Sequence, residues 1–411
     1  MSEAPSKPRL SLSSMLLYSA GSLGMGFFYA FGNFSLPLYL KRYPMSDAFI
    51  GLVTNTRSFA GAIIQPLVGA WSDRTWTRLG RRTPFFLITM PLVALLIFLT
   101  SFSLPLGPTV AAVLLFVVLF NVGADPYTAL QADLTPPGQR STLNSLATVW
   151  NAFGQLFYAL VSGLILWGIN PRYSFWFVSV GLCLGFAVTV LGVRETKGRL
   201  ERQKPLGLRA SLASLPRYRE ALKFYVVQFF LWFGINAATP FLTLFASREV
   251  AGVDERTAQV LAALLLAVTA VCAVPFGILG DRFSRKRLLG WGLGLFGLSS
   301  LAAAFFARNL AELAVLVVLI GVGNAGHTVL SYPLLTELAP AARIGEFWGL
   351  NTSFASVAAL VSAGLAGWLA DLFGSYRAVF VLTGLCLLAA LAVLQFVRPE
   401  RAAEALGSER G

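Results

Sequence analysis

Long apolar runs constrain this chain more than any other feature. Runs of roughly 18 or more residues recur from one end to the other, long enough to cross a hydrocarbon layer of ~30 Å as helices. Only 12% of the 411 residues are charged, against about 25% in an ordinary soluble protein. The pattern predicts an all-α membrane protein, with the lipid bilayer as a partner.

One short basic segment between two apolar runs has the character of a loop. Gly69–Pro84 reads GAWSDRTWTRLGRRTP and holds one acid, Asp73, among four arginines. Such a cluster is typical of a tight cytoplasmic turn between two spans. Gly277–Arg287 repeats the pattern in the second half of the chain, which suggests a duplicated transporter.

Breaks at charged and Pro/Gly-rich turns predict twelve transmembrane helices. Their ranges are 12–40, 47–71, 83–104, 108–134, 141–168, 172–193, 220–247, 256–280, 287–307, 310–338, 344–372 and 375–397. A polar, basic linker at 194–219 divides the chain into an N-terminal half, 1–193, and a C-terminal half, 220–411. We expect two pseudo-symmetric bundles of six helices, the second followed by a short cytoplasmic tail.

The net charge of +13 sets the predicted orientation. Lys and Arg gather at the N-terminus, the even-to-odd loops, the linker and the tail, and the opposite loops hold few. By the positive-inside rule both termini are cytoplasmic. Because the charge follows the loops, it indicates topology and no nucleic-acid partner. Three cysteines in apolar runs have no metal or disulfide spacing.

The two halves align with each other. Tyr29-Ala-Phe-Gly-Asn33-Phe-Ser-Leu-Pro37 matches Trp232-Phe-Gly-Ile-Asn236-Ala-Ala-Thr-Pro240 at an offset of 203 residues. Arg140 and Arg343 correspond at the same offset, and Asp133 and Glu337 at 204. Parallel repeats of this kind place a binding site near the membrane midplane between the halves.

The basic loop and its repeat resemble the G-x-x-x-D-R-x-x-R-R loops of the major facilitator superfamily. The longer pattern from Gln65-Pro66 through Ser72-Asp73-Arg74 to Gly80-Arg81-Arg82 is similar to the sucrose transporter and glycoside/cation symporter group. The segment from Pro126-Tyr127 to Gln139-Arg140 resembles that group as well. The resemblance implies the twelve-helix fold, with helices 1, 4, 7 and 10 lining a central cavity.

The chain departs from that group at its ion-coupling positions. Where melibiose-type members carry paired Asp residues for sodium, this chain has Gly61 and Gln65, which argues against such a metal site. Where plant sucrose transporters have an Asp in helix 4, it has Val117. Its own carboxylate, Asp125, lies about two turns nearer the cytoplasm.

Asp125 and Arg57 are the predicted proton-coupling residues. A charge in hydrocarbon costs at least ~2.5 kcal/mol, so Asp125 needs a partner or a wet cavity. Arg57 is the only basic residue well inside a span. Protonation of Asp125 would release Arg57 and couple proton entry to a conformational change. A permanent ion pair, or an acceptor role beside Pro126, is the alternative.

Amide and aromatic side chains on the cavity-lining helices are the predicted substrate ligands, because amides both donate to and accept from sugar hydroxyls. The candidates are Tyr29, Asn33, Asn121, Tyr127, Trp232, Asn236, Asn324 and His327, with Asn144, Trp150 and Asn151 on helix 5 and Asn351 on helix 11. Thr239, Ser331, Tyr332 and Gln155 accompany them. Hydrogen bonding between helices is the alternative for each, and packing is the alternative for the single histidine.

Charged residues at the cytoplasmic helix ends are the predicted gate. Asp73 and Asp281 would accept bonds from helix N-termini and arginines when that side closes. Asp133 is expected to lie with Arg140, and Glu337 with Arg343, at the matching ends of helices 4 and 10. Gly69, Arg74, Arg81 and Arg282 complete the gating set.

Together these features predict a monomeric secondary transporter of the inner or plasma membrane that moves a small sugar or glycoside with protons. The sequence has no P-loop, no cofactor motif and no clustered catalytic residues, so we do not expect an enzyme. A proton-coupled efflux transporter of lipophilic drugs on the same fold is the alternative, and a non-transporting sensor is the more distant one.

Overall fold

A computed structural model describes residues 10–136, 139–193, 195, 218–340 and 343–401; most side chains from 56 to 74 and a few in α5, α6 and α15 are not part of this description. Apart from two isolated β-bridges, the regular elements in these ranges are helices. The predicted linker 194–219 falls almost wholly outside them. The all-α prediction is confirmed.

The helices follow the predicted ranges closely. They are α1 (Leu12–Ala30), a π-turn (Phe31–Ser35), α2 (Leu36–Leu40), α3 (Asp47–Arg74), α4 (Thr83–Thr100), α5 (Leu106–Leu134), α6 (Arg140–Val161), a π-turn (Ser162–Leu166), α7 (Trp167–Ile169), α8 (Pro171–Gly192), α10 (Arg219–Ala238), a 3-10 turn (Thr239–Phe241), α11 (Leu242–Glu249), α12 (Glu255–Arg282), α13 (Arg285–Phe306), α14 (Leu310–Leu338), α15 (Ile344–Phe373) and α16 (Arg377–Gln395). Within the described residues, ten helices are long and apolar enough to span a membrane. The segments 12–40 and 47–74 are helical but are not among the ten.

Short polar residues and prolines explain where these helices begin and bend. Ser11, Asn170, Ser284 and Asn309 cap four helix N-termini by accepting backbone N–H bonds. Pro37 follows the π-turn and has no N–H to donate to the preceding turn, which accounts for the irregular winding there. Pro240 lies in the 3-10 turn at the equivalent place. Both repeated Asn–Pro motifs therefore interrupt their helices.

Contacts divide the chain into two compact units. Unit 1 contains Met1–Tyr43, Thr56–Leu200 and Glu255–Ala263, and unit 2 contains Pro44–Asn55, Glu201–Asp254 and Leu264–Gly411. The predicted halves remain a prediction, and the two units differ from them in two places. The first turns of α3 cluster with unit 2, and those of α12 cluster with unit 1.

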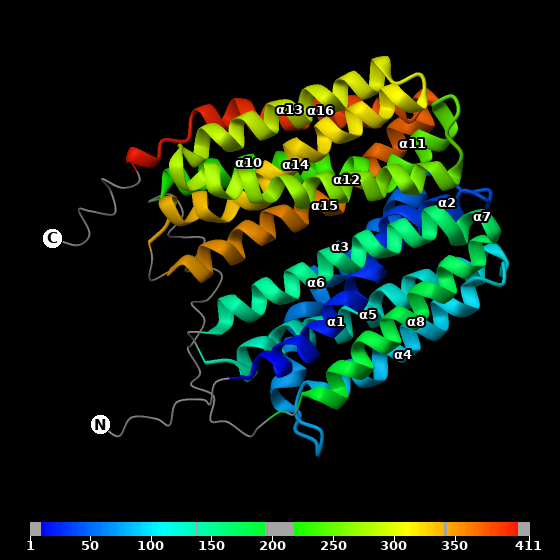
Figure 1. Ribbon diagram of the computed structural model, residues 1–411, viewed down its shortest axis with the longest axis vertical. Coiled ribbons are helices and arrows are strands. Elements are labelled where there is room, and N and C mark those ends of the chain that lie inside the picture. Colours follow the sequence, from blue (N-terminus) through cyan, green and yellow to red (C-terminus); the bar gives the residue numbers. More distant parts are fainter. Residues whose placement is uncertain (1–9, 137–138, 194, 196–217, 341–342, 402–411) are drawn as a thin grey trace. The chain divides into compact units, whose positions relative to one another are not determined.

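Within unit 1, α1 packs against α6 and α8, and α4 packs against α5 and α8 (Figure 1). Large rings fill the centre: Phe31, Phe116, Phe120 and Phe175 are all buried, and Phe28 stacks on Phe120 with ring centroids 3.8 Å apart.

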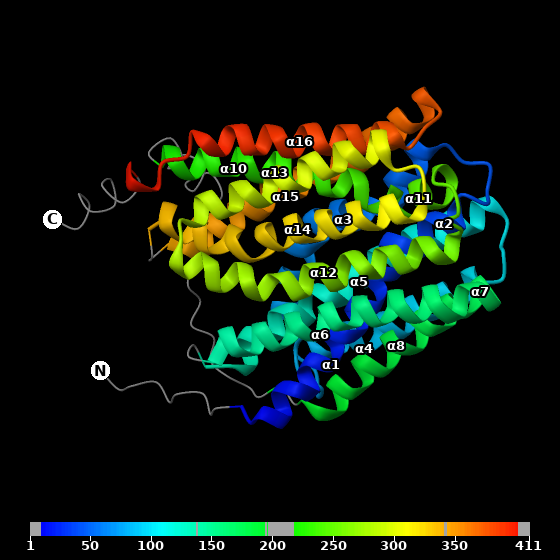
Figure 2. The same cartoon turned by 45° about the horizontal axis from the view of Figure 1, so that its top comes forward.

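Within unit 2, α13 packs against α14 and α16, and α10 packs against α15 and α16 (Figure 2). Its core is a continuous cluster of buried aliphatic and aromatic residues that includes Phe224, Tyr225, Leu293, Leu334 and Leu387.

Glycine allows α1 and α6 to approach at backbone distance. A Cβ on Gly154 would lie 2.4 Å from the Leu23 carbonyl oxygen, and one on Gly26 would lie 2.2 Å from that of Asn151.

Because both obstacles are backbone atoms, Gly154→Val must push the helices apart, at a cost of about 1–3 kcal/mol or more. We expect a lower thermal unfolding temperature of the detergent-purified protein. Gly349→Val is the matched control, since a Cβ there meets no atom within 4 Å; equal losses in both variants would contradict the close approach.

Candidate functional site

The membrane-spanning part of α5, Leu106–Gln131, contains one acidic residue, Asp125. It lies nine residues before Leu134, the end of that helix. Its Oδ2 atom is buried and has no hydrogen-bond partner among the described residues. A carboxylate in such a place favours its neutral form unless water or a cation reaches it. The side chain of Arg57 is outside the described part, so the predicted pairing stays a prediction.

Unit 1 holds two of the predicted substrate ligands in half-buried positions. Asn33 lies in the π-turn that interrupts the first helix, and π-turns are frequent at functional sites. Tyr29, one turn earlier, meets Phe120 edge to face with centroids 5.6 Å apart. Asn121 is buried and donates its amide to the Val117 carbonyl at 2.9 Å.

Tyr127, one of the predicted substrate ligands, lies in the packing between α1 and α5. It is only 2% exposed and stacks on Tyr18 with centroids 4.7 Å apart. Its hydroxyl donates to the Tyr18 carbonyl at 2.7 Å and lies 2.8 Å from the Ser22 hydroxyl. The residue therefore joins α5 to α1, and its polar atom is already satisfied there.

The candidate side chains on α6 differ in their surroundings: some are hydrogen-bonded in the packing and others are exposed or half-buried. Asn151 donates to the Ser22 carbonyl at 3.1 Å, and Gln155 donates to the Asn151 side-chain oxygen at 2.9 Å. These two residues follow the packing alternative. Asn144 is exposed and Trp150 is half-buried, with its ring perpendicular to that of Phe153.

Unit 2 brings together α10 and α14. The Trp232 ring meets the His327 ring at right angles, with centroids 5.2 Å apart. His327 is 7% exposed and its Nδ1 lies 3.0 Å from the Ser331 hydroxyl, while Asn236 donates to the Trp232 carbonyl at 2.8 Å. His327 thus has the packing environment given as its alternative, and Trp232 and Asn236 remain half-buried.

The other two amides of unit 2 differ in how well they are satisfied. Asn324 donates to the Thr269 hydroxyl at 3.3 Å. Asn351 is 3% exposed, and its side-chain oxygen has no partner among the described residues. An unsatisfied buried amide oxygen is costly, so Asn351 is a stronger candidate for a ligand contact than Asn324.

The ion pairs at the loop between α3 and α4 differ from the predicted ones. Asp133 accepts from Arg81 Nη2 at 2.7 Å and from Arg82 Nε at 2.6 Å. Arg140, the predicted partner of Asp133, is exposed. The loop places the two arginines at the end of α5, and both are buried. The side chains of Gly69, Asp73 and Arg74 lie outside the described part.

The second half repeats this arrangement with the same spacing. Glu337 accepts from Arg285 at 2.8 Å and not from Arg343, its predicted partner. The Arg343 guanidinium instead lies over the rings of Tyr218 and Phe347, at 5.7 and 5.6 Å. Asp281 lies 3.7 Å from Arg285 with its side chain 81% exposed, and Arg282 is exposed too.

Glu195, which contacts the loop between α3 and α4, is a residue that the sequence reasoning missed. Its carboxylate accepts from the backbone N–H groups of Arg81 at 2.8 Å, Arg82 at 3.0 Å and Thr83 at 2.7 Å, and from the Thr83 hydroxyl at 2.7 Å. It therefore caps α4 from beyond the end of α8. A signal existed, because Val193-Arg194-Glu195 recurs as Val397-Arg398-Pro399-Glu400.

The first turn of α12 is held in unit 1 by a buried amide that was also missed. Gln259 is fully buried, and its Oε1 accepts from the hydroxyls of Ser35 at 3.0 Å and Ser162 at 2.6 Å. Its Nε2 is buried with no partner among the described residues. These bonds join α12 to both π-turns of unit 1.

The first turn of α3 is held in unit 2 by carboxylates. Asp371 accepts from the backbone N–H groups of Asp47 at 2.8 Å and Ala48 at 2.9 Å, which is an N-cap supplied by another helix. The Tyr376 hydroxyl donates to Asp47 Oδ1 at 2.9 Å. Burial, together with the Asp47 carboxylate, raises the pKa of Tyr376, so this hydroxyl remains a donor.

Comparison with known proteins gives both a family and individual relatives. The family model of the Major Facilitator Superfamily matches residues 16–255 and 224–411. The sucrose transport protein SUC3 of Arabidopsis thaliana is 28% identical over 168 residues, which cover 36% of this chain and only 28% of that protein. The fosmidomycin resistance protein of Escherichia coli (strain K12) is 26% identical over 82% of this chain and 80% of that protein.

Solved structures give the same fold. The chain is similar to a bacterial homolog of the human lysosomal transporter Spinster, solved in an inward-facing and occupied conformation. The TM-score is 0.71 over 94% of this chain and 95% of the other, with 15% sequence identity. At that identity the likeness concerns the fold alone.

Proposed function

The chain belongs to the Major Facilitator Superfamily, and from this membership we propose that it carries a small sugar or glycoside across the membrane together with protons. It is a membrane transporter and not an enzyme. Transport proceeds by alternating access, in which the binding residues face one side of the membrane and then the other. The protein works as a monomer in the inner or plasma membrane with both termini in the cytoplasm.

The observation that carries the proposal is the buried Oδ2 of Asp125, which lacks a partner among the described residues of a membrane-spanning helix. An acid in this environment binds a proton from one side and releases it when water or Arg57 approaches. Its two protonation states differ in charge inside a medium of low polarity, so each favours a different conformation.

The sugar specificity rests on half-buried aromatic and amide side chains in both units. Asn33 lies within the π-turn that interrupts the first helix, and Asn236 lies three residues before the 3-10 turn that interrupts the seventh. Tyr29 and Trp232, four residues before them, supply rings on which the apolar face of a sugar packs. The partial match to the sucrose transport protein supports this substrate class.

Efflux of lipophilic drugs is the second candidate function. It is favoured by the fosmidomycin resistance protein, whose match extends over 82% of this chain while the sucrose transporter match covers 36%. A drug pocket would need less hydrogen bonding than the amides of both units offer.

Uptake into proteoliposomes tests the proposal. Labelled sucrose, maltose and simple glycosides are offered with and without an inward proton gradient, and a lipophilic cation is offered to the same vesicles. We expect one of the sugars to accumulate with the gradient and the cation to stay at the level of protein-free vesicles. Cation movement with no sugar uptake would establish the second candidate instead.

A further inference from the structure

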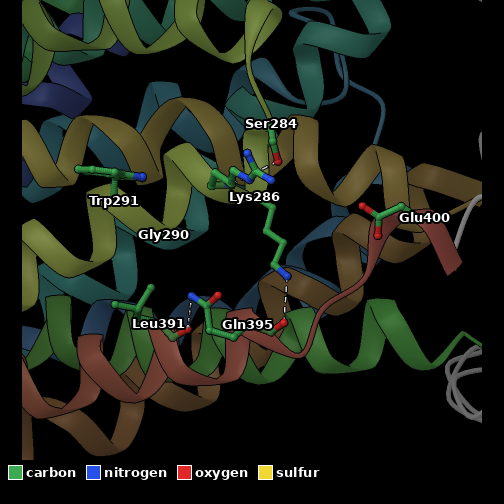
Figure 3. Close-up of a pocket in the computed structure, with 8 residues that line it drawn as sticks. Ser284, Lys286, Gly290, Trp291, Leu391, Gln395 and Glu400 are labelled. Atoms are coloured by element: carbon green, nitrogen blue, oxygen red, sulfur yellow. Dashed lines mark hydrogen bonds between the residues drawn. The ribbon is translucent and has the colours of Figure 1, made fainter.

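A cavity lies at one end of unit 2, apart from the candidate site residues described above. It has a volume of about 570 Å³ and lies alongside α13 and α16 (Figure 3). Lys286, Arg287 and Glu400 line one end, and Trp291 and Leu391 line the other. The cavity therefore has a charged end and an apolar end.

Its position along the helices places it at a membrane boundary. Both α13 and α16 are long and apolar enough to span a membrane, and the cavity lies where α13 begins and α16 ends. Trp291 is 78% exposed, and tryptophan is enriched at the level of lipid headgroups. The charged end thus faces the headgroup region and the apolar end faces the acyl chains.

The cations at the charged end retain hydrogen-bonding capacity. Lys286 Nζ donates to the Gln395 carbonyl at 2.9 Å, which leaves two of its three N–H groups. The Arg287 guanidinium has no hydrogen bond or ion pair with any residue that the structure describes. Glu400 also lines the cavity; Figure 3 shows it apart from Lys286, and no ion pair joins the two.

We propose that this cavity binds an anionic phospholipid whose headgroup carries hydroxyls, of the phosphatidylglycerol type. The phosphate lies between Lys286 and Arg287, and each of these side chains donates two N–H bonds to the phosphate oxygens. The headgroup hydroxyls donate to Glu400, and an acyl chain runs along Trp291 and Leu391. A free phosphate would use only the charged end, so the two-ended lining favours a lipid.

Fluorescence quenching by lipids with brominated acyl chains tests the site in the intact protein. The chain has nine tryptophans, so the Trp291 signal is taken as the difference between the unaltered protein and Trp291→Phe. In vesicles that contain a small fraction of brominated lipid, we expect brominated phosphatidylglycerol to quench this signal about tenfold more effectively than brominated phosphatidylcholine.

Charge variants connect the quenching to the cavity. Lys286→Gln with Arg287→Gln should remove most of the preference for phosphatidylglycerol. Arg248→Gln with Arg308→Gln is the matched control, because it removes two exposed positive charges near the opposite end of α13 from the cavity and should leave the preference intact. Glu400→Gln should reduce the preference for phosphatidylglycerol over phosphatidic acid, which lacks the hydroxyls.

Three results would overturn the lipid site: equal quenching by both brominated lipids, an unchanged preference in the Lys286/Arg287 variant, or loss of the preference in the control pair. Full displacement of the lipid effect by millimolar inorganic phosphate would assign the cavity to a free anion and reject the lipid. None of these readouts depends on transport, so the test stands apart from the proposed function.

Discussion

Proteoliposomes that contain Asp125→Asn will exchange sugar across the membrane but will not accumulate it against a gradient. Coupling to one proton allows about tenfold accumulation per unit of pH gradient, and an amide at this position carries no proton between the two sides. Exchange at equal pH survives, because asparagine preserves the size of the side chain and resembles the neutral acid. The measurement compares accumulation and counterflow of the same labelled sugar.

Two variants separate the proton role from a general effect of substitution. Asp125→Glu keeps a carboxylate and should retain part of the accumulation. Glu312→Gln, at the first turn of α14, makes the same chemical change at a helix end and should leave accumulation unchanged. If Asp125→Asn still accumulates sugar, another residue carries the proton. If it loses exchange as well, Asp125 holds the structure together, as in the alternative of a permanent ion pair.

Hydrophobic length and turn residues were enough to predict the fold. The range 310–338 was predicted for the tenth helix and is the range observed for α14, because Asn309 and the Pro/Ala segment after Leu338 mark both ends. The interruptions inside the first and seventh helices were not predicted. Pro37 and Pro240 support the repeat between the halves, and each also signals a break, because a proline removes a helical hydrogen bond.

The partners of the charged residues could not be predicted in the same way. Asp133 was assigned to Arg140 because the two lie near each other in sequence at one helix end. The loop between α3 and α4 instead turns at Gly80, with a φ of +111° and a bridge to Thr77, and brings Arg81 and Arg82 to the end of α5. Such a pairing across 52 residues follows from the loop geometry, which hydrophobic periodicity does not describe.

Side-chain direction was the other limit for the site. Tyr127 and Asn33 are both polar residues on cavity-lining helices, and sequence reasoning gave them the same role. Tyr127 points into the packing between α1 and α5, whereas Asn33 lies in a π-turn and is half-buried. A weakly amphipathic membrane helix has little polar contrast around its circumference, so its sequence does not identify the face that reaches the substrate.

The two halves contain the same ion pair in different surroundings, and this difference predicts different effects of removing it. Asp133 and Arg81 are separated by 52 residues, as are Glu337 and Arg285. The side chains of Arg81 and Arg82 are 7% and 9% exposed beside Asp133, but that of Arg285 is 30% exposed and that of Glu337 is 37% exposed. Removing one member of a buried pair leaves a desolvated charge, at a cost of about 3–5 kcal/mol, whereas an exposed pair contributes about 0–1 kcal/mol.

Asp133→Asn should therefore lower the thermal unfolding temperature of the purified transporter far more than Glu337→Gln does. Both variants exchange a carboxylate for the corresponding amide, so size and propensity are matched and burial is what differs. High salt should weaken the contribution of Glu337 further and change that of Asp133 little, because buried charges are poorly screened. Equal losses of stability in the two variants would show that the buried arginines find other compensation, and that the Asp133 cluster acts only as a surface contact.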